Sequence, residues 1–107
     1  MGADPVYGMW TIDVPGAGTT RAVLERAGDS PLDALFVCAH GAGGHMDDAA
    51  MCGAAQALRA AGFDIVRFNF LYREAGSARP DPMPRLERCF AAVLEHVRRE
   101  CAPQRLL

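Results

Sequence analysis

The sequence predicts an α/β fold, in which a mostly parallel sheet is the middle layer of a three-layer αβα sandwich and an antiparallel hairpin precedes it. One observation is an apolar segment without alternation, residues 34–39, which is typical of a strand covered on both faces. Another is a glycine-rich turn followed by an alanine-rich helical segment and a strand at 63–70, which indicates a βαβ unit. The order of the elements agrees: the hairpin comes first, and a second helix follows the βαβ unit.

The hairpin is predicted over residues 6–26. Residues 6–14 alternate between two faces, as a half-buried strand does. Pro15-Gly16-Ala17-Gly18 has the composition of a turn, and an extended pattern resumes after it.

Two helices are predicted. The first spans about 47–61, with Asp47 and Asp48 at its N-terminal end and Gly62 just past its C-terminal end. Its expected apolar face consists of Ala50, Ala54, Ala57, Leu58 and Ala61. A linker is expected at 71–81, and a second helix at 83–101. The expected core face of this helix consists of Leu86, Phe90, Val93, Leu94, Val97 and Cys101.

The chain of 107 residues is expected to be one partial domain. A further apolar strand begins at 104–107, and a domain does not normally end inside a central strand. The missing C-terminal half of the same domain is therefore the partner that we expect. Without it, the apolar strand 35–39 would lack a neighbour on one side, so we expect the chain alone to be poorly stable and prone to aggregate.

Composition excludes several classes of function. All 11 basic residues are Arg, the net charge is −2 and the isoelectric point is about 5.8, so neither nucleic acid nor a membrane is an expected partner. No apolar run of membrane-spanning length and no signal peptide is present, which favours a cytoplasmic location. The four cysteines form no C-x-x-C pair, which makes a zinc site improbable, and we expect buried free thiols. No cofactor and no metal are expected.

The sharpest motif is His40-Gly41-Ala42-Gly43-Gly44-His45, between a buried strand and a helix. Such a turn either cradles a phosphate or presents backbone N–H groups to an oxyanion. The dinucleotide fingerprint would need glycine at position 46, which holds Met, and an acidic residue at the end of the next strand, which holds Asn69 and Phe70. The oxyanion interpretation is therefore favoured.

The segment FVCAHGAGGHMDDAAMCGAAQALRAAGFDIVRFNF, residues 36–70, resembles the α/β-hydrolase superfamily. More narrowly, it is similar to bacterial hydrolases grouped with the testis-expressed and NSL-complex hydrolase-like domain family. The resemblance extends from about 35 to 107. It implies the N-terminal half of an α/β-hydrolase sandwich, with the nucleophile elbow just after the strand at 104–107 and the Asp and His of the triad further on.

The resemblance also implies roles for individual residues. The backbone N–H of Ala42, helped by that of Gly43, would form part of an oxyanion hole, while His40 and Gly41 would support the loop. The implied activity is hydrolysis of an ester, thioester or amide in a small-molecule substrate by a serine acyl-enzyme. The alternative is a catalytically silent, hydrolase-like binding or scaffold module. Ser30 and Ser77 are the only serines and neither lies in an elbow, so we expect the chain alone to be inactive.

Other polar residues have two interpretations each. Asn69 and Tyr72 could contact substrate, with Arg73 and Arg79 on the rim of the cleft or simply in solvent. His45 with its acidic neighbours, residues 47–48, could form a metal corner, although carboxylates in the first turn of a helix are ordinary partners of its dipole. His96 is expected to be solvated.

Overall fold

The computed structural model describes residues 7–27, 34–41, 43–77, 79–101 and 105–106. Its elements in chain order are β1 (Tyr7–Val14), β2 (Gly18–Glu25), β3 (Ala34–Ala39), α1 (Ala49–Ala60), β4 (Asp64–Phe68), α2 (Leu71–Glu74), α3 (Met83–Cys101) and β5 (Arg105–Leu106).

The strands form a single mixed sheet in the order β1-β2-β4-β3-β5. The predicted hairpin is present: β1 and β2 pair antiparallel, with Tyr7 opposite Glu25 and Val14 opposite Gly18. Strand β2 also pairs antiparallel with β4, whereas β3 is parallel to both β4 and β5. The predicted α/β fold class with its N-terminal hairpin is confirmed. Parallel pairing is confined to the β4-β3-β5 part of the described sheet.

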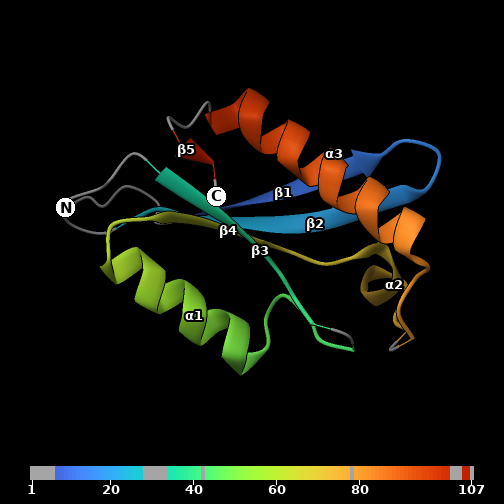
Figure 1. Ribbon diagram of the computed structural model, residues 1–107, viewed down its shortest axis with the longest axis horizontal. Coiled ribbons are helices and arrows are strands. Elements are labelled where there is room, and N and C mark those ends of the chain that lie inside the picture. The colour runs from blue at the N-terminus through green and yellow to red at the C-terminus, as the bar shows by residue number, and fades with distance from the viewer. Residues whose placement is uncertain (1–6, 28–33, 42, 78, 102–104, 107) are drawn as a thin grey trace.

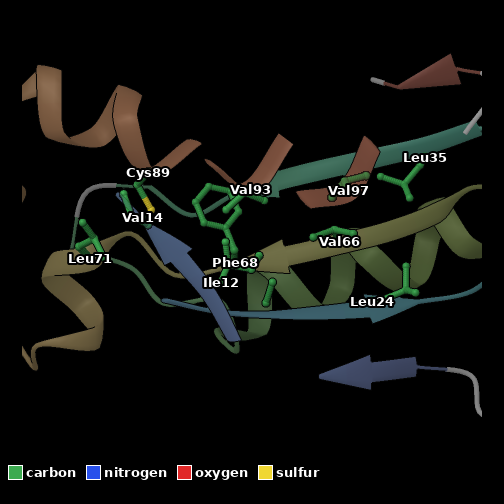
Figure 2. Packing of buried hydrophobic residues seen from close by; sticks show 11 residues of the cluster. Ile12, Val14, Leu24, Leu35, Val66, Phe68, Leu71, Cys89, Val93 and Val97 are labelled. Atoms are coloured by element: carbon green, nitrogen blue, oxygen red, sulfur yellow. The ribbon is translucent and has the colours of Figure 1, made fainter. Parts of the chain in front are cut away.

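The helices form the outer layers (Figure 1). Helix α1 lies on one face of the sheet and α3 on the other, so the sheet is the middle layer. The main core lies between the sheet and α3. Figure 2 shows Cys89, Val93 and Val97 of α3 facing Val66 and Phe68 of β4. Each fully buried side chain of this size contributes about 1.5–3 kcal/mol through the apolar surface that it removes from water.

The face that α1 turns toward the sheet shares only Leu58 with the predicted one. Ala55 is the buried residue of the helix, and Met51 and Leu58 are half-buried beside it. In contrast, the alanines of the predicted face are exposed: Ala50, Ala54, Ala57 and Ala61. Because alanine is abundant all round this helix, it carries little information about which side is buried. The larger side chains of Met51 and Leu58 determine the orientation instead.

Helix α3 has the predicted bounds, but its buried line is shifted. Cys89, Val93 and Val97, four residues apart, are fully buried, while Phe90 is 37% exposed and stacks on Phe68. The thiol of Cys89 is shorter than a phenyl ring and suits the closest approach to the sheet.

The predicted linker at 71–81 begins with a turn of helix, α2, so it is not wholly irregular. Buried Leu71 and Tyr72 anchor this turn, and their burial is what favours a helical turn over a solvated loop. The turn lies directly after β4, at the carboxyl end of the parallel strands, close to the loop that leaves β3 (Figure 1).

Candidate functional site

The glycine loop leaves the carboxyl end of β3 and enters α1. The Gly44 N–H donates to Gly41 O at 2.9 Å, which closes a four-residue turn. Gly43, the third residue of that turn, has φ 74°, a left-handed value that glycine adopts at least cost. Ala42, the predicted oxyanion donor, lies outside the described residues.

His40 braces the loop from below. Its Nε2 accepts the Phe70 N–H at 3.0 Å, so the ring proton is on Nδ1, which donates to Gly41 O at 2.9 Å. The ring is buried and meets the rings of Phe70 and Tyr72 edge-on, at centroid distances of 5.2 and 5.7 Å. These contacts hold the first glycine of the loop against the segment that follows β4.

Two glycines of the loop face different surroundings. A Cβ atom on Gly44 would lie 3.1 Å from Gly41 O and 3.0 Å from a carboxylate oxygen of Asp48, so the chain can approach itself here only without a side chain. A Cβ atom on Gly41 would meet nothing within 4 Å. Gly41 is exposed and borders open space, where a ligand could approach the loop.

Two polar side chains of β4 and its end hold the far end of the loop. Arg67 Nη1 donates to Met46 O, and Asn69 Oδ1 accepts the Met46 N–H at 2.8 Å. Residues 67 and 69 are two apart, so both side chains leave the extended chain on the same face, where Met46 is buried between the loop and α1. The backbone N–H and C=O of Met46 are thereby both held by hydrogen bonds.

Carboxylates compensate the charge of Arg67, which is only 7% exposed. Glu25 Oε1 accepts from Nε at 2.6 Å, and Asp47 Oδ1 accepts from Nη1 at 2.9 Å. Burial acts to lower the pKa of Arg67, but the hydrogen bonds to Asp47 and Glu25 outweigh it, and the pKa is raised. The guanidinium therefore stays charged and ties β2, β4 and the start of α1 together.

Asn69 is fully buried, and its side chain is occupied within the protein. Its Nδ2 donates to Glu74 Oε2 at 2.6 Å, and Thr20 Oγ1 donates to its backbone oxygen. Glu74 is also paired with Arg21 Nε at 3.0 Å, and this hydrogen bond raises the pKa of Arg21. Asn69 thus links the loop, β2 and α2, and contact of this side chain with substrate stays a prediction.

Tyr72 reaches back from α2 to the glycine loop. Its hydroxyl oxygen accepts the Gly43 N–H at 3.2 Å and lies 3.5 Å from Gly41 O. The residue is 5% exposed, and its backbone N–H donates to Asp81 Oδ2 at 3.1 Å. The predicted second oxyanion donor, the N–H of Gly43, therefore already has an acceptor.

Arg73 and Arg79 make local contacts, whereas His45 Nε2 also lies 3.3 Å from Asn69 Nδ2. Arg73 Nη1 donates to Ser77 O at 3.3 Å, and the Arg79 backbone N–H donates to Ser77 Oγ at 3.0 Å. His45 Nδ1 accepts the Asp47 N–H at 3.1 Å.

The acidic residues at the start of α1 also have partners in the protein. Asp48 accepts the His45 N–H at 2.8 Å, and Asp47 is paired with Arg67. Within the described ranges, no three or more His, Cys, Asp or Glu side chains are grouped as a metal ion would require. The helices of these ranges are also too short or too polar to cross a bilayer.

His96 differs from its prediction. It is half-buried, and its ring meets Trp10 of β1 edge-on at 4.7 Å. The aromatic partner lies across the sequence on the edge strand, so the charged residues beside His96 in the helix did not indicate it.

The cysteines are free, but they are not uniformly buried. Cys89 is fully buried, and burial raises the pKa of its thiol to about 11. Burial also raises the pKa of Cys38 and of Cys101, which are half-buried. Cys52 is exposed on α1, so the expectation of buried thiols is wrong for this residue. Its place follows from the orientation of α1 described above.

The comparisons with known proteins agree with this geometry. A family model described as an alpha/beta hydrolase domain matches residues 32–107. Among solved structures, XC6422 from Xanthomonas campestris, described as an a/b serine hydrolase without lid, is 25% identical with a TM-score of 0.72. The match covers 96% of this chain and 51% of that one.

Two further structures share the fold. An alpha-beta serine hydrolase homologue from Coxiella burnetii is 21% identical with a TM-score of 0.76, covering 98% of this chain and 51% of that one. Est1E from Butyrivibrio proteoclasticus is 17% identical with a TM-score of 0.73, and the match covers 92% of this chain and 38% of that one. The chain thus spans about half the length, or less, of these structures. Comparison with curated protein sequences finds no match.

Proposed function

The chain belongs to the alpha/beta hydrolase domain family, and from this premise we propose that the protein containing it is a serine hydrolase that cleaves an ester, thioester or amide bond. The observation that carries the proposal is the glycine loop at the carboxyl end of parallel strand β3. The loop is braced by His40, Arg67 and Asn69 on its inner side and borders open space at Gly41. The narrower similarity to the testis-expressed and NSL-complex branch remains part of this proposal.

In the proposed reaction the loop stabilises negative charge. A serine hydroxyl attacks the substrate carbonyl carbon, a histidine takes the hydroxyl proton, and the carbonyl oxygen becomes an oxyanion. The histidine proton then passes to the leaving group, and water hydrolyses the acyl-enzyme by the same steps in reverse order. We assign the backbone N–H of Ala42 as one oxyanion donor. A well-aimed donor of this kind is worth about 3 kcal/mol in the transition state.

The nucleophile, the acid and the base are proposed to come from a segment outside these 107 residues. Ser77 does not fit the nucleophile, because it lies in the loop after α2 rather than in a strand-to-helix elbow, and its Oγ accepts the Arg79 N–H. Ser30 lies outside the described residues.

The proposal is tested with protein expressed from its complete reading frame. We expect turnover of short p-nitrophenyl esters and covalent labelling by a fluorophosphonate, which reacts with activated serines. A folded protein that shows neither property would contradict the serine hydrolase and favour a hydrolase-like binding module.

The role of Ala42 has a separate test. Proline has no backbone N–H, so Ala42→Pro removes the proposed donor. We expect kcat to fall by about 100-fold or more with the fold retained. Unchanged kinetics in the folded variant would refute the assignment.

A further inference from the structure

Tyr72 places a phenolic hydroxyl at the glycine loop, and the state of its proton is informative. A hydroxyl has one proton to donate and lone pairs with which to accept. The Gly43 N–H, 3.2 Å away, uses a lone pair of the Tyr72 oxygen. The phenolic proton therefore needs a different partner.

Within the described residues, the hydrogen-bond acceptor in reach of that proton is Gly41 O, and it is a poor one. The distance is 3.5 Å, at the outer limit for a hydrogen bond. Gly41 O also already accepts the Gly44 N–H and the His40 Nδ1–H, each at 2.9 Å. Since a carbonyl oxygen has two lone pairs, both are taken, and the phenolic proton is left weakly bonded.

The hydroxyl is nevertheless held firmly in place. The ring of Tyr72 stacks with Phe70 at 6.5 Å and meets the edge of His40, and the residue is buried. Its backbone N–H and C=O are bonded to Asp81 and Ser77, at 3.1 and 2.9 Å. A donor fixed in this way needs no reorganisation when charge develops near it.

The hydroxyl contacts residues that reach the surface of the described structure. The two residues that it contacts, Gly41 and Gly43, are exposed, although the tyrosine itself is buried. The N–H that it accepts also comes from the residue directly after Ala42. The hydroxyl is thus at the boundary between the protein interior and the loop at which the proposed oxyanion forms.

We infer that the Tyr72 hydroxyl is itself a donor to the oxyanion, a catalytic residue that acts beside the backbone N–H of Ala42. The Gly43 N–H acts through it: by bonding to the phenolic oxygen it orients the hydroxyl and polarises its O–H bond. This inference rests on the proposed serine hydrolase function and adds a side-chain donor to its oxyanion hole.

The same geometry also allows the opposite role, in which the Tyr72 hydroxyl blocks the Gly43 N–H. If the hydroxyl merely occupied the Gly43 N–H, its removal would free a backbone donor, and activity would stay the same or rise. Removal of a true donor lowers activity. The sign of the change in kcat for Tyr72→Phe therefore separates the two.

The experiment uses protein from the complete reading frame and compares wild type, Tyr72→Phe and Tyr7→Phe. Tyr7→Phe deletes the same hydroxyl from the other tyrosine, on edge strand β1, and is the matched control. We expect kcat to fall about 100-fold in Tyr72→Phe, with KM changed less than about threefold. Affinity for a trifluoromethyl ketone, which forms an oxyanion with the serine, should fall by the same factor as kcat. Tyr7→Phe should match wild type.

A second variant distinguishes donation from a structural role and serves also if Tyr72→Phe does not fold. Difluorotyrosine incorporated at position 72 keeps the shape of the ring but loses its phenolic proton nearer neutral pH. We expect its kcat to fall at the pH at which this phenol ionises, a step absent from the wild-type profile.

Three outcomes would overturn the inference: unchanged or raised kcat in folded Tyr72→Phe, loss of kcat without loss of ketone affinity, or a difluorotyrosine profile without the added step. The proposed function fails separately, and the inference with it, if wild type neither hydrolyses esters nor reacts with a fluorophosphonate.

Discussion

Replacing Gly44 by alanine is expected to damage the glycine loop, whereas the same change at Gly41 is expected to leave its structure intact. The added Cβ at Gly44 would lie 3.1 Å from Gly41 O, 3.0 Å from Asp48 Oδ2 and 3.4 Å from His40 Cβ. The backbone oxygen cannot retreat without weakening the 2.9 Å hydrogen bond that closes the turn. The carboxylate of Asp48 is similarly held, because it accepts the His45 N–H.

The magnitude follows from these contacts. Overpacking of one methyl group costs about 1–3 kcal/mol, and a weakened turn hydrogen bond adds about 1 kcal/mol. The lower entropy of the unfolded alanine chain offsets about 0.4–1 kcal/mol of this. We therefore expect Gly44→Ala to lower the free energy of unfolding by about 1–3 kcal/mol. Gly41→Ala, whose Cβ meets nothing within 4 Å, should change it by less than about 1 kcal/mol.

The assay is denaturant unfolding of the complete protein and of both variants, followed by ester turnover. If Gly44→Ala unfolds at the same denaturant concentration as Gly41→Ala, the described geometry of the turn is incorrect. Because Gly41 borders open space, a loss of activity in folded Gly41→Ala would report on the approach of substrate and not on the fold.

Four further predictions concern the residues that brace the loop and two of the cysteines. Asn69→Asp should lower the free energy of unfolding at pH 7 by about 2–4 kcal/mol, since it places a buried carboxylate 2.6 Å from that of Glu74. Adding Glu74→Gln to the same protein should recover much of this loss. Arg67→Met should destabilise by about 1–3 kcal/mol, because the Met46 oxygen and the half-buried carboxylate of Glu25 lose this donor, and a cost below about 0.5 kcal/mol would contradict the bracing role of Arg67. Iodoacetamide at pH 8 should modify Cys52 in the folded protein and leave Cys89 unmodified, because burial raises the pKa of the Cys89 thiol to about 11; equal labelling by mass spectrometry would refute this. Because the pKa of the Cys89 thiol is raised on folding, this group stabilises the folded state fully below about pH 9. The free energy of unfolding should then fall as the pH rises toward about 11, and this fall should be absent in Cys89→Ala.

The sequence predicts the sheet and the position of the loop well, because their signals are local. The unbroken apolar run of β3, the alternation of β1 and the turn at residues 15–18 each determine a backbone conformation over a few residues. Burial on α1 was predicted wrongly for the alanines, though not for Leu58, and the reason is physical. Alanine is present on nearly every side of that helix, so the apolar pattern predicts a helix but not which of its faces is buried.

The contacts that brace the loop were harder to predict, since they join residues distant in sequence. Arg67 and Asn69 gave a signal, two polar residues spaced by two in an apolar strand, which indicates a shared face but not the Met46 peptide between them. Tyr72 was a candidate substrate contact, but nothing in the sequence indicated its contact with Gly43. Its hydroxyl reaches Gly43 across 29 positions because the residues after β4 form a turn of helix in place of the expected linker.

A crystal structure of the complete protein after reaction with a fluorophosphonate tests the central claim most directly. The phosphoryl oxygen of the adduct occupies the position of the oxyanion. We expect this oxygen to lie within hydrogen-bond distance of the Ala42 N–H and of the Tyr72 hydroxyl, with Gly43 still donating to the phenolic oxygen. An adduct whose phosphoryl oxygen points away from residues 41–43, toward donors elsewhere in the protein, would contradict the account.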